Sequence, residues 1–182
     1  MLVLGHGAGG AVETPDLLAA RDAALLLGMC VVRVEQPWRV RGRRIAEAAP
    51  RLDLAWLAVL SSLAPSGPLV VGGRSAGARV ACRTAGQVGA VAVLALGFPL
   101  QPPRGRASRL AELQAPAVPR LVVQGSRDAF GVPTPEPGLE VHVVAGADHG
   151  FTVRRSDART DDEVSDDVRS AVVGWLARVL RR

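Results

Sequence analysis

Six short apolar runs alternate along the chain with segments of helical periodicity, and this alternation is the strongest constraint on the fold. The runs consist mostly of Val, Leu and Ala, which is typical of parallel strands that are covered on both faces. They occupy residues 1–4, 30–34, 69–71, 90–96, 121–124 and 139–144. The pattern predicts an α/β fold in which helices cover both faces of a doubly wound, mostly parallel six-stranded sheet. Because no linker interrupts the alternation, we expect one domain over residues 1–182.

Helix signals fill the intervals between these runs. The first predicted helix begins at Thr14-Pro15, an N-cap followed by proline at the first helical position, and ends at Gly28. One further helix is expected to begin near residue 50 and another at residue 76. Two more are expected over residues 109–113 and 163–180.

The basic residues of the chain are all arginine, and Lys, Asn and Tyr do not occur. The missing types have A/T-rich codons, so the composition indicates a GC-rich genome and a bacterial source. The net charge of +5 is therefore weak evidence for an anionic partner. Residues 39–44 form the densest basic stretch, which we expect to be a short loop. Only 3% of the residues are aromatic, and no pair has the spacing of a base-stacking platform. We expect no nucleic-acid partner.

Targeting and redox signals are also missing from the sequence. The apolar start is interrupted by residues 5–7 (Gly-His-Gly), too early for the hydrophobic region of a signal peptide. The longest apolar run, residues 88–98, is well short of the ~20 residues that span a membrane. Cys30 and Cys82 stand alone in apolar segments and are expected to be buried free thiols. We expect a cytoplasmic protein with no membrane partner, no metal and no cofactor.

The most specific motif follows the third apolar run. Residues 72–77 (Gly-Gly-Arg-Ser-Ala-Gly) contain a G-x-S-x-G nucleophile elbow in its required context of strand, sharp turn and helix. The turn holds Ser75 in strained backbone, and a Cβ at position 73 or 77 would crowd a neighbouring strand or helix. Ser75 is thus a candidate nucleophile. The alternative is a glycine turn with a structural role only.

A glycine-rich loop, residues 5–10 (Gly-His-Gly-Ala-Gly-Gly), follows the first apolar run. It lacks the Gly-Lys-Ser/Thr ending of a P-loop and the spacing of a dinucleotide-binding loop. An oxyanion hole suits it better, with the backbone N–H groups of Ala8 and Ala76 as the donors. His6 is then expected to order the loop and not to act as a base.

Asp128 and His149 follow the fifth and sixth runs, so both lie at carboxyl ends of predicted strands. In an α/β sheet these ends meet at one edge, and the chain order Ser, Asp, His is the one that this fold uses. His142 lies within a strand and is expected to be packed or at the surface. Asp148 is more typical of a residue that stabilises a turn. Glu136 lies in a proline-rich loop, and nothing in its position indicates a catalytic role.

Together these motifs resemble the α/β-hydrolase superfamily, and within it the small dienelactone-hydrolase-like proteins. The chain is most similar to the family named for the testis-expressed hydrolase-like protein and the third subunit of the NSL chromatin complex, which has many bacterial members. The segments that carry the resemblance are residues 4–10, 72–77, 96–100, 124–131 and 148–151.

The resemblance implies Ser75 as nucleophile, His149 as base and Asp128 as the acid that orients the base. Dienelactone hydrolases use Cys as the nucleophile, so Ser75 indicates ordinary serine esterase chemistry. Superfamily members usually have one or two strands before the oxyanion strand, whereas here that strand is the first. The run at residues 30–34 could then be a bare sheet edge, through which a homodimer could form.

These inferences predict a serine hydrolase, a carboxylesterase that acts on small-molecule esters through an acyl-enzyme on Ser75. Residues 97–120 are too few for a lid domain, so we expect an open site and a preference for short acyl groups. Phe98, Leu100 and Pro102 are candidates for its rim, and Arg74 for a contact with an anionic substrate. The sequence does not distinguish an esterase from a thioesterase or peptidase. The alternative from another class is a non-catalytic hydrolase-like module that binds proteins.

Overall fold

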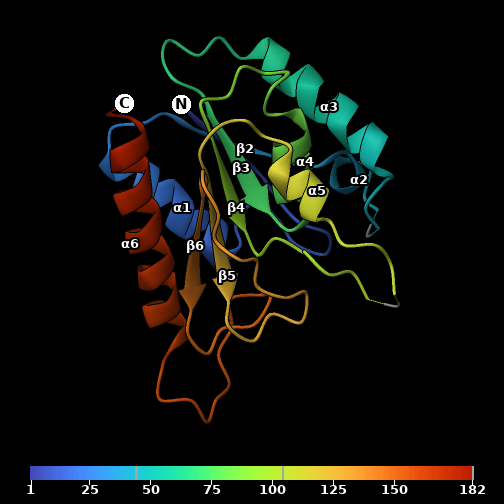
Figure 1. Ribbon diagram of the computed structural model, residues 1–182. Helices are drawn as coiled ribbons and strands as arrows, with labels where there is room; N and C mark the ends of the chain where they lie inside the picture. The colour runs from blue at the N-terminus through green and yellow to red at the C-terminus, as the bar shows by residue number, and fades with distance from the viewer. Residues whose placement is uncertain (44, 104, 182) are drawn as a thin grey trace.

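A computed structural model describes residues 1–43, 45–103 and 105–181 (Figure 1). Within these residues the six predicted strands form one sheet in which all neighbouring strands are parallel. The spatial order of the strands is β2-β1-β3-β4-β5-β6. Their bounds are β1 (Leu2–Gly5), β2 (Val31–Val34), β3 (Val70–Arg74), β4 (Ala92–Leu96), β5 (Arg120–Gly125) and β6 (Leu139–Val144). The predicted fold class is confirmed.

The helices of the described residues are α1 (Pro15–Leu26), α2 (Pro37–Val40), α3 (Ala49–Ser62), α4 (Ala76–Thr84), α5 (Leu110–Gln114) and α6 (Asp161–Val179). Helix α1 begins as predicted, with Thr14 extended at the N-cap and a proline in the first turn. Helix α6 begins earlier than predicted, because Thr160 and Glu163 form a capping box.

The basic stretch of residues 39–44 was predicted to be a loop, and this is wrong for its beginning. Gln36 is the N-cap of α2 and Pro37 starts the helix, so Arg39 is helical. Arg41 and Gly42 then form a turn. Arg44 lies outside the described residues.

Helices cover both faces of the sheet, as Figure 1 shows, with α1 and α6 side by side on one face and α3, α4 and α5 on the other. Leu17 of α1 and Trp175 of α6 are fully buried in the core of the first face. Trp56 of α3 and Leu113 of α5 are buried in the core of the second face. Apolar burial on both faces explains why the strands read as nearly continuous apolar runs.

The two cysteines differ in their surroundings. Cys82 of α4 is buried as predicted, and burial raises the pKa of its thiol to about 12. Cys30 is exposed, so the prediction that it is buried is wrong. The physical reason is its position just before β2, which is the edge strand and has only one strand neighbour. The homodimer through this edge stays a prediction. No helix of the described residues is long and apolar enough to cross a membrane.

Because all six strands are parallel, their carboxyl ends share one edge of the sheet, and β1 and β3 lie side by side there. Gly5 of β1 is in register with Gly73 of β3. A Cβ added to Gly73 would lie 2.3 Å from the Gly5 carbonyl oxygen, and a Cβ on Gly77 of α4 would lie 2.1 Å from the same atom. Glycine at these positions lets β1, the turn after β3 and the start of α4 approach one another.

We expect Gly77→Ala to destabilise the protein by at least about 3 kcal/mol, because its methyl group would overlap backbone that cannot move aside. Gly86, two residues beyond α4, is the matched control, since a Cβ there meets no atom within 4 Å. Gly86→Ala should change the free energy of unfolding by less than about 0.5 kcal/mol. Urea denaturation of both variants measures the difference. Similar values for the two would contradict the close approach.

Candidate active site

Ser75 lies on the turn between β3 and α4, in a backbone conformation that L residues rarely adopt. Its φ is 52° and its ψ is −107°, so the residue is strained. The surrounding structure holds it there: the Ser75 N–H donates to the carbonyl of Leu96 at the end of β4, with an N···O distance of 2.9 Å. The strain turns the side chain away from the sheet at its carboxyl edge, as the elbow motif predicts.

The structure brings the three predicted residues Ser75, His149 and Asp128 into one hydrogen-bonded chain. His149 Nε2 lies 3.2 Å from Ser75 Oγ, and His149 Nδ1 lies 2.7 Å from Asp128 Oδ2. A carboxylate can only accept, so Nδ1 carries the proton and Nε2 is free to accept from the serine hydroxyl. The Phe130 ring packs against the imidazole, with 4.5 Å between the ring centroids.

Asp128 is fixed by two further donors that sequence reasoning did not identify. Gln124 Nε2 donates to Asp128 Oδ2 at 2.6 Å, and the Phe130 N–H donates to Oδ1 at 2.8 Å. The Asp128 side chain is fully buried, and these bonds satisfy its oxygens in place of water. Gln124 itself is fully buried at the end of β5. The sequence signal that could have identified Gln124 is its place as a polar residue at the end of the apolar run 121–124.

The glycine-rich loop after β1 is held by His6, which is fully buried. The Gln36 N–H donates to His6 Nε2 at 2.9 Å, so the proton must be on Nδ1, which then donates to the Gly7 carbonyl at 2.9 Å. Burial lowers the pKa of His6 below its ordinary value of 6.5, which keeps the ring neutral. The Trp38 ring meets the imidazole edge-on at a centroid distance of 5.3 Å. The expectation that His6 orders this loop agrees with these contacts.

This loop passes beside the serine. A Cβ on Gly7 would lie 3.0 Å from Ser75 Cβ, so the two backbones are in close contact. Ala8 follows on the same loop and is exposed, and Ala76 opens α4 directly after Ser75. The two predicted oxyanion donors therefore lie on segments that flank Ser75. Their role stays a prediction.

Three residues predicted to contact substrate are turned into the protein. Phe98 is fully buried and Leu100 is 8% exposed, because the chain after β4 folds back into the core of the second face. Their assignment to the rim of the site is therefore wrong. The Arg74 side chain is only 13% exposed and reaches Asp16 and His149, so its contact with an anionic substrate stays a prediction. Pro102 of the predicted rim is buried too.

The competing candidates have other roles. Asp148 Oδ1 accepts from the N–H groups of Gly150 and Thr152, which confirms it as a turn-stabilising residue. His142 is partly exposed on β6 and lies 2.7 Å from Asp167 of α6. In residues 1–43, 45–103 and 105–181, no group of three or more His, Cys, Asp or Glu is placed to hold a metal ion.

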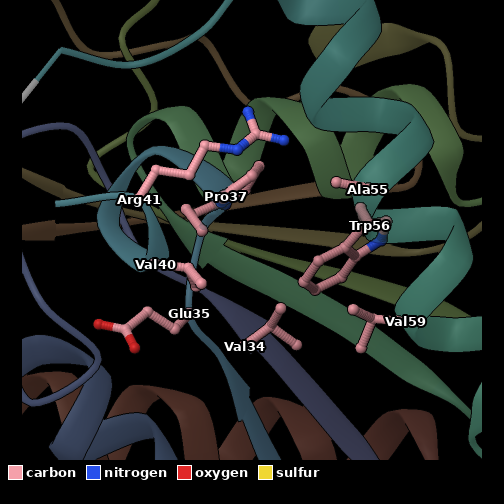
Figure 2. Close-up of a pocket in the computed structure, with 9 residues that line it drawn as sticks. Val34, Glu35, Pro37, Val40, Arg41, Ala55, Trp56 and Val59 are labelled. Carbon is pink, nitrogen blue, oxygen red and sulfur yellow. The ribbon is translucent and has the colours of Figure 1, made fainter. Parts of the chain in front are cut away.

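A separate apolar cavity of about 240 Å³ lies between the end of β2, α2 and α3 (Figure 2). Val34, Pro37 and Trp56 surround it, while Glu35 and Arg41 bring charge to its border (Figure 2). Ser75, Asp128 and His149 are not among the residues that line it. Gln36 lines the cavity and is the residue that bonds His6, so this space adjoins the support of the glycine-rich loop and not the serine.

Comparisons with known proteins agree with the fold described above. A family model described as "Alpha/beta hydrolase domain" matches residues 1–177. No curated protein matches the chain.

Several solved structures have a similar fold. A lidless α/β serine hydrolase from Xanthomonas campestris, XC6422, is 20% identical, with 96% of this chain and 82% of that chain covered and a TM-score of 0.71. An α/β serine hydrolase homologue from Coxiella burnetii is 18% identical, with coverage of 97% and 85% and a TM-score of 0.70. Est1E from Butyrivibrio proteoclasticus is 14% identical, with coverage of 100% and 88% and a TM-score of 0.69.

The neutral His6 predicts a loss of stability in acid. Above pH 6.5 the ring is neutral in both the folded and the unfolded chain, so it causes no pH dependence. Below that pH the unfolded chain takes up a proton that the folded protein resists, and stability falls until the lowered folded pKa is reached. His6→Gln keeps an acceptor for the Gln36 N–H but cannot titrate. We expect its free energy of unfolding to fall less between pH 7 and pH 5 than that of the wild type.

Urea denaturation at the two pH values measures this difference. His142 and His149 are present in both proteins, so the comparison isolates the contribution of His6. Equal acid sensitivity of the two proteins would contradict a neutral, buried His6.

Proposed function

The chain belongs to the alpha/beta hydrolase family, and from this we propose that it is a serine carboxylesterase that cleaves small acyl esters through an acyl-enzyme on Ser75. The observation that carries the proposal is the hydrogen-bonded chain from Ser75 Oγ through His149 to the buried Asp128. A serine with only a structural role on a surface turn would need neither the bonded histidine nor the buried carboxylate. From its sequence motifs, we propose that the chain belongs with the dienelactone-hydrolase-like and testis-expressed hydrolase-like proteins. We also propose that it acts in a bacterial cytoplasm.

In the first half-reaction, Ser75 Oγ attacks the carbonyl carbon of the ester while His149 Nε2 takes the hydroxyl proton. Negative charge develops on the carbonyl oxygen and is held by the N–H groups of Ala8 and Ala76. Asp128 stabilises the imidazolium through Nδ1–H. His149 then gives its proton to the alkoxide as the C–O bond breaks, so the alcohol leaves and the acyl group stays on Ser75.

In the second half-reaction, water replaces the alcohol. His149 takes a proton from the water as its oxygen attacks the acyl carbon, and the same oxyanion donors hold the tetrahedral intermediate. Collapse of this intermediate returns the proton to Ser75 and releases the carboxylic acid. The fixed position of Asp128, which accepts from Gln124 and Phe130, keeps His149 in the tautomer that both steps need.

The size of the molecule supports a small substrate. Superfamily insertions that form lids need more room than residues 97–120 give, and in the described part of that segment α5 is the only helix. With no large apolar cover, the site has little surface on which to bind a long acyl chain. A small-molecule ester with a short acyl group suits an open site of this kind.

Removal of the nucleophile tests the proposal. Ser75→Ala should abolish covalent labelling by a fluorophosphonate probe and lower kcat on p-nitrophenyl butyrate at least about 10⁴-fold. Asp128→Asn, which leaves the shape intact but disturbs the histidine tautomer, should lower kcat by about 10⁴-fold. Ser61→Ala is the matched control, because Ser61 is exposed on α3 and bonds only the carbonyl of Ala58. Labelling that persists in Ser75→Ala would overturn the assignment, and a wild type that never labels would favour the protein-binding module.

Acyl chain length gives a second test. We expect kcat/KM to be highest for acetyl and butyryl esters and to fall for dodecanoyl esters, because an open site buries little of a long chain. A series of p-nitrophenyl esters measures the trend. Equivalent thioesters and p-nitroanilides, assayed beside them, separate an esterase from a thioesterase or peptidase. Higher kcat/KM for the long chains would contradict the open site.

A further inference from the structure

The guanidinium of Arg74, the residue before Ser75, links the nucleophile turn to the loop that carries His149. Arg74 Nη2 donates to the main-chain carbonyl of His149 at 3.1 Å. Its Nε lies 3.2 Å from Asp16 Oδ2 at the start of α1. The Arg74 side chain thus runs inward from the end of β3, between α1 on one side and the β6–α6 loop on the other.

Asp16 is an unusual partner because its side chain is fully buried. Neither of its oxygens has a hydrogen bond of good geometry among the described residues, and Arg74 Nε also lacks one. Charge and proximity hold the ion pair, and the Thr14 hydroxyl and the N–H groups of Asp16 and Leu17 at the amino end of α1 also favour the carboxylate. Burial raises the pKa of Asp16, and Arg74 opposes that rise. A carboxylate in such a place is costly unless a cation compensates it.

Other arginine pairs of the molecule are built differently. Arg83 of α4 makes short hydrogen bonds to Asp53 of α3 and to Glu112 of α5, and it is 18% exposed. That network joins helices on one face of the sheet, and within the described residues it makes no hydrogen bond to Ser75 or His149. Arg74 and Arg83 are thus similarly buried and both face carboxylates, but of the two only Arg74 contacts the main chain of a proposed catalytic residue.

We propose that Arg74 and Asp16 form a positioning pair for His149: Asp16 holds the guanidinium, and the guanidinium holds the His149 main chain in register with Ser75. This rests on the proposed function of Ser75 and His149. Asp128 fixes the imidazole from β5, but its bond leaves the backbone of His149 free to shift relative to the turn after β3. Arg74 is covalently next to Ser75, so its bond to the His149 carbonyl sets the distance between the base and the nucleophile. A displacement of about 1 Å between reacting groups can cost about 10²-fold in rate.

The test compares Arg74→Met, Arg74→Lys and Asp16→Asn with the control Arg83→Met. The readouts are kcat and KM on p-nitrophenyl butyrate per titrated active site, the fluorophosphonate labelling rate, and the downfield proton NMR signal of the His149 Nδ1–H bonded to Asp128. We expect Arg74→Met to lower kcat and the labelling rate by about 10- to 100-fold, with KM changed less than about twofold and the NMR signal shifted or lost. Asp16→Asn should cause a smaller loss in the same direction. Arg83→Met should lower only the thermal midpoint.

If Arg74→Met does not fold, Arg74→Lys tests the proposal in its place. It keeps the charge beside Asp16 but cannot also place a donor at the His149 carbonyl as the forked guanidinium does, so we expect a partial loss of kcat in a folded protein. Unchanged kcat and NMR signal in the folded Arg74 variants would overturn the proposal. A loss confined to KM would also overturn it and would make Arg74 a substrate-binding residue. If the wild type neither labels nor turns over, the proposed function fails, while the NMR signal still reports whether Arg74 positions His149.

Discussion

The close approach of β1 to the turn after β3 is the constraint on which the rest of the site depends. The Gly5 carbonyl oxygen occupies the space that a side chain on Gly73 or Gly77 would need. With glycine there, α4 starts directly against the end of β1, Ser75 is forced to a φ of 52°, and the glycine-rich loop passes beside it. The nucleophile and the proposed oxyanion donors are therefore set by one backbone contact, before any side chain contributes.

Side chains then hold the loops against this backbone, each through a hydrogen bond to the main chain. His6 joins Gly7 to Gln36, Gln124 bonds both the N–H and the carbonyl of Phe98, and Arg74 bonds the carbonyl of His149. His6 and Gln124 are fully buried and Arg74 is partly buried, so water competes little for these bonds and their loss would leave polar groups unsatisfied.

The sequence allowed the sheet, the elbow and the Ser75, Asp128 and His149 set to be predicted, because apolar periodicity and the residues after each strand determine them. The direction of a side chain in a loop was not predictable. Arg74 ends β3 and Phe98 follows β4 at the functional edge, yet Phe98 returns to the core and Arg74 turns towards Asp16. Helix α2 was missed because a four-residue helix has no periodicity to read. Cys30 was misplaced because an edge strand and a central one look alike in apolar content.

Asp16 shows why such partners escape sequence reasoning and still matter to the chemistry. In the sequence it is an acidic residue in the first turn of a helix, which the helix dipole alone explains. Only the fold places it under Arg74, where water cannot solvate its charge. An ordinary capping residue would lie at the surface and could be replaced at little cost. Because Asp16 is buried, its charge is tolerable only with Arg74 and the amino end of α1 to stabilise it, and the same arginine reaches the proposed base. Stability and the geometry of the site are thus coupled through one ion pair.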